Sequence, residues 1–428
     1  AVSCRRKIDN FTDTGVTHNY ISMLGQPDFE SMFSPVLESD LARESLSCLR
    51  LLECLPDINL WTQYLEEPEQ ISAWETLAHS IAKCMDHQSQ ESTDIRWLKI
   101  IHKTIVGKIV YPDTMKERIE EFRLYPNKGD MRVVRPSIRA LEMGLRNAET
   151  GAEKPDHIPD GPGEAFWDEC FKKTECIHSN IDFPEVEDVK SLLDEITKIQ
   201  ISVDRHFFET MSRTSVDVRH EGAFGLTFYA LSLLFELAHS RSHLLAGGRI
   251  LLRSIMETYV TLHYLKHNDN ETIWAQYRNY GAGQTKLAFL KGLRDEEVPD
   301  FIDLKDLEDL ANEDMWLEFQ EINLGAWANK NLRAMAVESG CKEIYDKYYS
   351  WSSGFAHAHW GAVRYTSFQI CMNPLHRLHH IPTPPQPSNS ALIDGCKLCN
   401  LVLDDLGALY PSMRDRIGWH KLHRGAEL

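Results

Sequence analysis

Apolar residues recur three and four positions apart along most of the chain, which is the spacing of an amphipathic helix. Residues 41–55 (LARESLSCLRLLECL) and 71–85 (ISAWETLAHSIAKCM) are two early examples. In the second half, the same spacing predicts helices over roughly 186–211, 216–241, 248–268, 270–293, 342–361 and 391–410. Long alternating runs of β-branched residues are scarce, so the sequence predicts a mostly all-α fold.

Changes in composition divide the chain into two helical parts. Residues 149–167 are rich in Pro, Gly and Asp, which is typical of a loop. The acidic residues after Pro184 suit the start of a new helix, where the helix dipole favours negative charge. The expected parts are a helical N-terminal domain, a linker and a helical-bundle domain, over 1–150, 151–183 and 184–428.

A proline-rich segment, NPLHRLHHIPTPPQPSNS, covers residues 373–390 within the second domain. Helical periodicity is lost there, so we expect a loop or flap. Its cluster of His376, His379 and His380 is expected to be solvated.

Charge and composition narrow the classes of function. The 428 residues include 43% hydrophobic side chains, enough for a sizeable core, and the net charge is −18. That charge argues against a broad nucleic-acid surface, which needs clustered Lys and Arg, but leaves RNA binding in a local cleft open. No uninterrupted apolar run is long enough to span a membrane, the first residues lack a signal-peptide core, and the ten cysteines show no disulfide-scaffold spacing. We therefore expect a cytoplasmic protein without a membrane partner.

The segment 248–265 is apolar almost all round, yet it carries a polar stripe at four-residue spacing. The stripe consists of Arg249, Arg253, Glu257 and Thr261, and Arg253 and Glu257 are placed to pair. Buried charges are costly unless they are paired or hydrated. The stripe is therefore either a structural ion pair within the bundle or the lining of a polar cleft.

A second polar group lies in YYSWSSGFAHAHWGAVR, residues 348–364. If this stretch is helical, Ser353, His357 and Gly361 share one face. His357 is then a candidate general base or acid, because histidine titrates near neutrality, and His359 is the secondary candidate. The alternative is a histidine satisfied in the core or placed as a cation at a helix C-terminus.

Three sets of residues were considered as metal ligands. Glu236 and His239 form a Glu-x-x-His pair, as in di-iron bundles, with Glu209 and Glu257 as loose further ligands. A second such pair, Glu175 and His178, falls in a loop. Cys396 and Cys399 precede His420 and His423, which are ligand types that zinc prefers, but both cysteines also fit the apolar face of a helix. The sequence favours none of these sets, and we predict no metal and no cofactor.

The second half resembles a bacterial family of unknown function, DUF5677, over about residues 200–365. The first part of the resemblance is an Arg-Ser-x-x-Glu helix, and the others are a Trp-x-x-Tyr-x-x-Tyr segment and a tyrosine-rich helix ending in Ser and His. The matching residues are Arg253, Ser254, Glu257, Trp274, Tyr277, Tyr280, Tyr345, Tyr348, Ser352 or Ser353, and His357. In outline such a bundle is similar to HEPN nucleases, although the compact R-x(4–6)-H motif of that class is absent, because Arg253 and His357 fall on different predicted helices.

Three functions remain open at this point. The first is a bacterial defence or toxin-type effector, a metal-independent HEPN-like ribonuclease. In it His357 moves a proton, Arg253 with Arg249 stabilises the phosphorane, and Glu257 orients Arg253. The second is a non-enzymatic helical module of a defence system that binds a ligand or a protein, including a second copy of itself. The third is a metal-dependent oxidase of the di-iron type.

Overall fold

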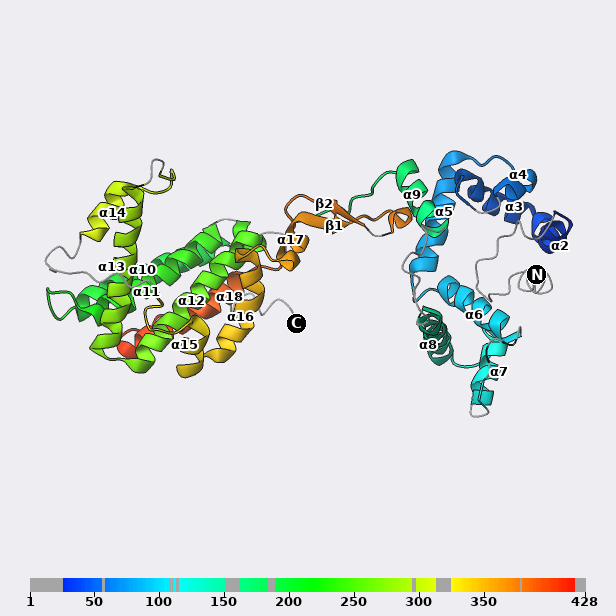
Figure 1. The fold of residues 1–428 in the computed structure, drawn as a ribbon. Coiled ribbons are helices and arrows are strands. Elements are labelled where there is room, and N and C mark those ends of the chain that lie inside the picture. The colour runs from blue at the N-terminus through cyan, green and yellow to red at the C-terminus, as the bar shows by residue number, and fades with distance from the viewer. Residues whose placement is uncertain are drawn as a thin grey trace. The chain divides into compact units, whose positions relative to one another are not determined.

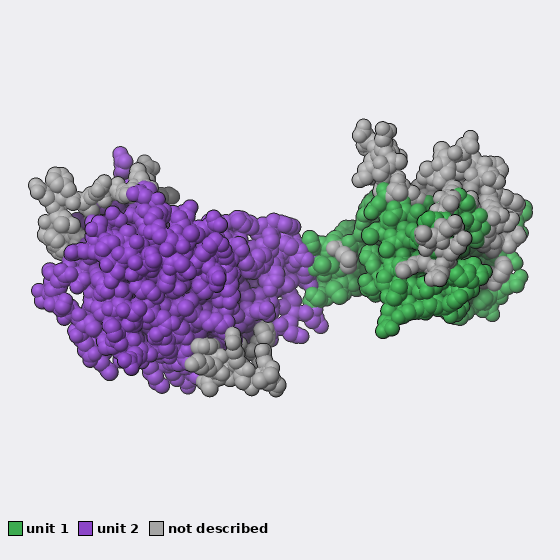
Figure 2. Space-filling model, turned by 90° about the horizontal axis from the view of Figure 1, so that it is seen from below, with its two compact units in different colours: residues 1–179, 370–381 green, residues 180–369, 382–428 purple. Residues whose placement is uncertain are grey.

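The computed structural model describes residues 26–55, 58–105, 107, 109, 111–112, 115–150, 162–183, 189–239, 241–294, 298–312, 325–377 and 379–419. The protein is mostly helical, with one two-stranded sheet among the described residues, which confirms the predicted fold class. The chain forms two compact units (Figure 2). Unit 1 comprises residues 1–179 and 370–381, and unit 2 comprises residues 180–369 and 382–428.

Unit 1 is built from short and medium helices (Figure 1). They are α2 (Gln26–Leu37), α3 (Asp40–Ser47), the 3-10 helix η2 (Cys48–Leu51), α4 (Ile58–Tyr64), α5 (Gln70–Met85), α6 (Gln90–Ile105), α7 (Lys116–Leu124), α8 (Met131–Thr150) and α9 (Pro162–Lys173). The described apolar residues form several small cores, centred on Phe29 with Trp61, on Leu52 with Leu77, and on Ile100 with Ile138.

Unit 2 is a bundle of longer helices followed by a small β-ribbon and a last helix (Figure 1). The elements are α10 (Val189–Thr210), α11 (Val218–His239), η4 (Arg241–Leu244), α12 (Ala246–Asn268), α13 (Glu271–Gly292), α14 (Leu304–Ala311), α15 (Leu332–Glu338), α16 (Lys342–Ala356), α17 (Trp360–Ser367), β1 (Phe368–Ile370), η5 (Pro374–His376), β2 (His380–Pro382) and α18 (Leu392–Leu409). Of these, Ile370 to Ile381 belong to unit 1.

Helix α12 lies at the centre of the bundle and packs against α11, α16 and α18. Its Ile255, Met256, Val260 and Leu265 are fully buried, as the nearly continuous apolar surface of this helix predicts. Among the described residues, α11 is the one helix whose length and apolar composition would suffice to cross a membrane. Slightly more than half of its most apolar stretch is buried within the bundle.

The expected linker over 151–183 is not a single loop. Its first part lies outside the described residues, but Pro162–Lys173 form α9. The Glu169 carboxylate of α9 accepts hydrogen bonds from the backbone N–H groups of Glu53 and Cys54, both at 2.8 Å. Proline at the start and lysines in the last turn are typical of a helix. In the prediction of a linker, the Pro/Gly-rich composition of the preceding residues outweighed these two signals.

The expected flap over 373–390 is also wrong in part. Leu375 is 1% exposed and packs in the unit 1 core, and His376 is only 4% exposed, whereas the expected solvation holds for His380. Near the end of the segment, the Ser388 N–H donates to the Leu244 carbonyl at 2.8 Å. The segment is therefore fastened at both ends, because its backbone polar groups and one apolar side chain find partners.

A buried carboxylate joins α12 to α18. Asp405 is 4% exposed, its Oδ2 lies 2.8 Å from His263 Nδ1, and its Oδ1 accepts a hydrogen bond from the Lys266 ammonium. His263 Nε2 in turn lies 3.1 Å from the Ser339 carbonyl oxygen, which adds the loop after α15 to the network. A carboxylate at this depth is tolerated because two basic groups compensate its charge.

We predict that Asp405→Asn lowers the free energy of unfolding by about 2–3 kcal/mol, because it leaves His263 and Lys266 without their charged acceptor. Chemical denaturation followed by circular dichroism measures this. The control is Asp404→Asn, which breaks the more exposed pair with Arg416 and should cost about 1 kcal/mol or less. Equal losses in the two variants would show that Asp405 has no special structural role.

Candidate functional site

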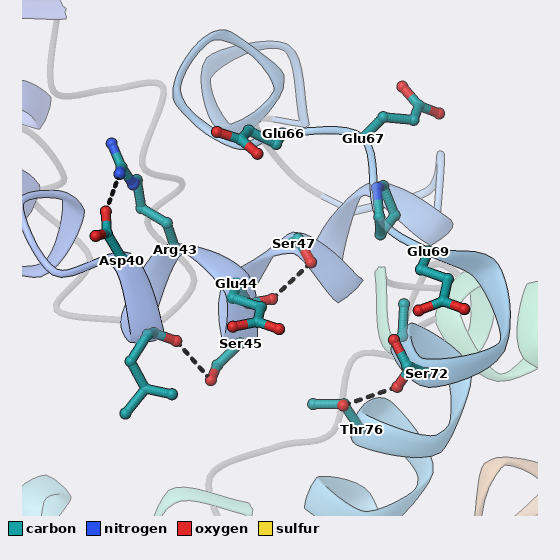
Figure 3. A pocket seen from close by; sticks show the side chains of 13 residues that line it. Asp40, Arg43, Glu44, Ser45, Ser47, Glu66, Glu67, Glu69, Ser72 and Thr76 are labelled. Carbon is teal, nitrogen blue, oxygen red and sulfur yellow. Dashed lines mark hydrogen bonds and ion pairs between the residues drawn. The ribbon is translucent and has the colours of Figure 1, made fainter.

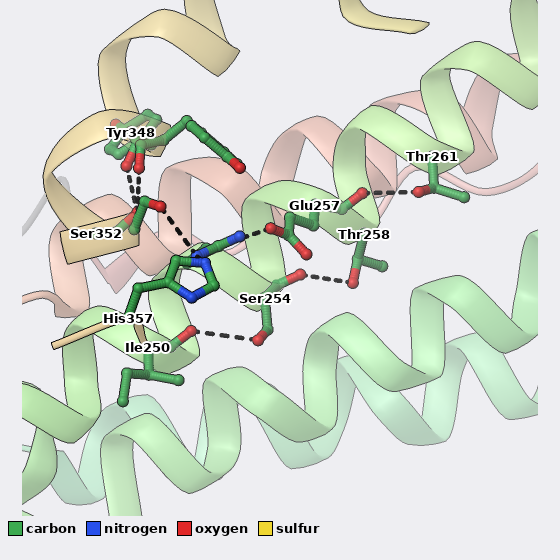
Figure 4. Close-up of polar contacts among 11 residues, drawn as sticks. Ile250, Ser254, Glu257, Thr258, Thr261, Tyr348, Ser352 and His357 are labelled. Atoms are coloured by element: carbon green, nitrogen blue, oxygen red, sulfur yellow. Dashed lines mark hydrogen bonds and ion pairs between the residues drawn. The ribbon is translucent and has the colours of Figure 1, made fainter. Parts of the chain in front are cut away.

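Arg253 connects α12 to α16 through three polar contacts. Its Nε donates to Glu257 Oε1 at 2.7 Å, and its Nη1 lies 3.3 Å from Ser353 Oγ and 3.2 Å from His357 Nε2. The guanidinium also lies over the Tyr349 ring, 4.8 Å from its centroid. The predicted pairing of Arg253 with Glu257 is thus confirmed, and His357 joins it (Figure 4). We call Arg253, Glu257, Ser353 and His357 the Arg253 site.

The Arg253 site is buried on one side and open on the other. The Arg253 side chain is 15% exposed and that of Glu257 is 38% exposed, whereas Ser353 is buried and His357 is exposed. Nη2 of Arg253 makes no hydrogen bond to any residue that the structure describes. Two guanidinium N–H groups therefore remain available on a side chain whose position is otherwise held from both helices.

His357 is the C-cap of α16, and the helix breaks directly after it. The prediction of one helix over 342–361 is wrong, because α16 ends at Ala356 and α17 begins at Trp360. The His359 N–H bonds to the Gly354 carbonyl at 2.9 Å, and Ala358 has φ +50°, which together form the C-terminal cap known as a Schellman motif. A non-glycine residue in this left-handed conformation costs about 1–2 kcal/mol, so the surrounding structure must compensate it.

His359 lies beside His357 and is the N-cap of α17. The two imidazole centroids are 6.0 Å apart, and both side chains are exposed. Two large aromatic side chains of the same segment are also exposed, Trp351 at 54% and Trp360 at 65%. The break between α16 and α17 thus presents two histidines and two indoles to solvent.

Arg249 is not part of the Arg253 site, although the four-residue spacing predicted that it shares a polar stripe with Arg253. Its Nη1 donates to the carbonyl oxygens of His243, at 2.8 Å, and Leu245, at 3.3 Å, and its Nη2 donates to the Asn389 carbonyl. Burial lowers the pKa of the Arg249 guanidinium from its ordinary value. Arg249 therefore fastens the start of α12 to the segment before α18, and it is a structural residue.

The tyrosines and serines of α16 divide between core and site. Ser352 donates its hydroxyl to the Tyr348 carbonyl within the helix (Figure 4). Ser353 is therefore the serine that reaches Arg253. The Tyr348 hydroxyl donates to Asp394 at 2.9 Å, and burial, then the Asp394 charge, raise its pKa above the ordinary value. Trp274 is fully buried in the core and does not belong to the site.

None of the metal sets considered from the sequence forms a site among the described residues. Glu209, Glu236 and His239 are exposed, whereas a di-iron site needs carboxylates directed into the bundle. Cys396 and Cys399 are fully buried in the unit 2 core, as their apolar helix face suggested, and His420 and His423 lie outside the described residues.

One other group of side chains in the described part of the chain converges closely enough to hold a metal ion. Its members belong to unit 1 and are Cys176, Cys371, His376 and His379. This four-residue group was not predicted from the sequence. The local signal was the spacing of Cys371, His376 and His379, while Cys176 is 200 residues away from His376.

An acidic hollow of about 610 Å³ lies in unit 1 between α3 and the start of α5 (Figure 3). Asp40, Glu44, Glu66, Glu67 and Glu69 contribute carboxylates to its lining. The negative charge of this hollow makes it unsuited to bind RNA.

Residues 226–369 match the model of a family of unknown function, DUF5677, which supports the resemblance expected from the sequence for this part of the chain. The match includes all four residues of the Arg253 site and most of α11, and it includes no residue of unit 1. No curated protein and no solved structure matches the chain significantly.

We predict that Arg249→Ala lowers the free energy of unfolding by about 2–3 kcal/mol, because three carbonyl oxygens lose a charged donor. His357→Ala removes an exposed side chain and should cost about 0.5 kcal/mol or less. Thermal and chemical denaturation of the two variants measure the difference. A loss for His357→Ala as large as that for Arg249→Ala would mean that His357 mainly holds the bundle together.

Proposed function

We propose that the Arg253 site binds the phosphodiester backbone of RNA and cleaves it without a metal ion, by attack of a ribose 2′-hydroxyl on phosphorus. The observation that carries this proposal is the free Nη2 edge of Arg253 next to two exposed histidines whose centroids are 6.0 Å apart. This reaction needs a base, an acid and a cation for the charge that develops on phosphorus.

His357 is suited to act as the base. A guanidinium only donates hydrogen bonds, so in the 3.2 Å contact with Arg253 Nη1 the Nε2 atom of His357 is an acceptor without a proton. When RNA binds, the 2′-hydroxyl replaces Arg253 Nη1 as the donor to Nε2, and Nε2 takes its proton while the bond from O2′ to phosphorus forms. His359, in its protonated form, gives a proton to the 5′-oxygen as the bond from phosphorus to that oxygen breaks. The products are a 2′,3′-cyclic phosphate and a 5′-hydroxyl.

Arg253 and its partners supply the electrostatic part of the reaction. Its free N–H groups stabilise the additional negative charge of the phosphorane, which is greatest in the transition state. Glu257 and Tyr349 keep the guanidinium in place before substrate arrives, so little reorganisation is needed. Ser353 is buried and positions Arg253 from α16.

Single-stranded RNA is the substrate class that fits the surroundings. Unstacked bases bind to exposed aromatic rings, and Trp351 and Trp360 flank the two histidines in the sequence and are more than half exposed. The net charge of −18 limits the contact to a few nucleotides, because no large basic surface can follow the RNA backbone.

Cleavage of cellular RNA harms the cell that produces the enzyme. We therefore propose a bacterial defence or toxin-type effector acting in the cytoplasm, and its outline resemblance to HEPN nucleases stays a prediction from the sequence. A homodimer or a partner protein that controls the activity is part of the same proposal.

A second candidate is a non-enzymatic module that binds a ligand or a protein. The observation in its favour is that Arg253 also joins α12 to α16, so the same contacts serve the stability of the bundle. The two candidates differ in what His357 does, because an exposed histidine contributes little to the packing of the two helices.

We predict that the full-length protein cleaves 5′-labelled single-stranded RNA in buffer without added divalent cations. Gel electrophoresis and mass spectrometry should find 2′,3′-cyclic phosphate ends, and 2′-O-methyl RNA should resist cleavage. His357→Ala should lower the rate about 10²–10⁴-fold and Arg253→Lys about 10²–10³-fold, with melting temperatures near that of the wild type for His357→Ala.

The matched control is His239→Ala, which removes an exposed histidine of α11 that stacks on Phe235 and is not part of the Arg253 site. It should cleave RNA at the wild-type rate. Absence of cleavage by the wild type, or a rate that is the same in His357→Ala, would reject the nuclease. RNA binding without cleavage that is lost in Arg253→Lys would favour the binding module.

A further inference from the structure

Four ligand side chains from two distant parts of the sequence meet in unit 1. Cys176 follows the end of α9, and the other three lie in the turn that joins β1 to β2. Their ligand atoms are the sulfurs of Cys176 and Cys371 and one ring nitrogen each of His376 and His379, and all lie within 4.8 Å of one another. We propose that these residues bind a zinc ion with four protein ligands, which fastens residues 370–381 to the end of α9.

The distances between the ligand atoms fit a single tetrahedral ion. His376 Nδ1 lies 3.5 Å from the Cys176 sulfur and 3.4 Å from the Cys371 sulfur, and His379 Nε2 lies 3.4 Å from the Cys176 sulfur. With a zinc–sulfur bond of about 2.3 Å and a zinc–nitrogen bond of about 2.0–2.1 Å, tetrahedral angles place sulfur and nitrogen about 3.5 Å apart.

Hydrogen bonds between thiols and imidazoles explain this arrangement less well. His376 Nδ1 has a single lone pair when its proton is on Nε2, yet it contacts the sulfurs of both Cys176 and Cys371. An iron–sulfur cluster of the Rieske type binds its cysteines and histidines to different iron atoms, which does not suit one nitrogen that touches both sulfurs. A tetrahedral set of two sulfurs and two nitrogens is the set that zinc prefers.

Neighbouring side chains hold His376 in the orientation that a ligand needs. The Thr174 hydroxyl donates to the Cys170 carbonyl at 2.8 Å, so its oxygen is free to accept from His376 Nε2, which lies 2.9 Å away. The proton is then on Nε2, and Nδ1 carries the lone pair directed at the sulfurs. Such an outer hydrogen bond is the usual support of a metal-bound histidine.

Asn373 fixes the turn that carries three of the ligands. Its Nδ2 donates to Thr174 Oγ1 at 3.2 Å and to the Glu175 carbonyl at 2.8 Å, and its Oδ1 accepts from the Leu375 N–H at 3.0 Å. The Cys371 N–H also donates to the His379 carbonyl at 2.9 Å. The backbone therefore brings the ligands together independently of the ion.

The site is closed, and this defines its role. Four protein ligands leave no position for water or substrate, which is the pattern of structural rather than catalytic zinc. Leu375 packs in the same core as Leu52 and Leu77, so the turn is part of unit 1. In the sequence, however, this turn comes after most of the residues of unit 2. Zinc joins these two parts of the sequence, and its binding free energy adds to the stability of unit 1.

We predict that the full-length protein, purified without a histidine tag under reducing conditions, contains about one zinc per chain by elemental mass spectrometry. Cys371→Ser and His379→Asn should retain about one tenth or less. The matched controls are Cys84→Ser and His380→Asn, which change an exposed cysteine of α5 and the neighbour of His379 in β2, and both should retain the full amount. Iron in place of zinc, or full zinc in the Cys371→Ser variant, would overturn the proposal.

Two measurements keep the test valid if the ligand variants do not fold. The metal-free wild type is titrated with Co²⁺, which should give the visible absorption of a tetrahedral ion and a sulfur-to-cobalt charge-transfer band that saturate at one equivalent. Thr174→Val keeps all four ligands and should weaken the affinity about 10–100-fold. Neither zinc nor a cobalt spectrum in the wild type, or a Cys176–Cys371 disulfide found by mass spectrometry, would reject the site.

Discussion

The burial of α12 is the constraint on which the rest of unit 2 depends. A helix packed on three sides can keep charged groups only if each finds a partner, because an unpaired buried charge costs several kcal/mol. His263 and Lys266 of α12 meet this requirement with Asp405 of α18, and Arg253 meets it with Glu257. The Asp405 contacts join α18 to α12, and Arg253 also reaches Ser353 of α16.

The same constraint creates the Arg253 site. The guanidinium is held by its own helix and by α16, so it cannot turn away from the surface where α16 ends. His357 reaches it from the C-cap of α16, where its N–H bonds to the Ser353 carbonyl. The nuclease proposal and the binding-module proposal therefore start from the same arrangement, and they differ in whether His357 transfers a proton there.

Unit 1 differs from unit 2 because its described apolar residues form several small cores rather than one large core. Small cores supply little stabilisation, and metal sites are a common supplement. The Cys176–Cys371–His376–His379 cluster lies beside the core that contains Leu375, where the turn from residues 370–381 enters the unit. A zinc ion there stabilises the part of unit 1 that is most distant in sequence.

Local sequence determined the features whose causes are local. Helical periodicity predicted α10 to α13 to within a few residues, and four-residue spacing predicted the pairing of Arg253 with Glu257, because both depend on neighbours within one turn. His357 was selected correctly as the histidine next to Arg253, but on the assumption of a continuous helix that Ala358 breaks.

Only the tertiary structure decided which distant groups meet. Arg249 belongs to the same stripe as Arg253, yet it turns to backbone carbonyls that include Asn389, a contact that spacing along one helix cannot reveal. Cys176 and His376 are 200 residues apart, and nothing in the sequence near either one specifies the other. Periodicity reports which face of an element is buried, whereas a site built from two elements depends on how those faces pack.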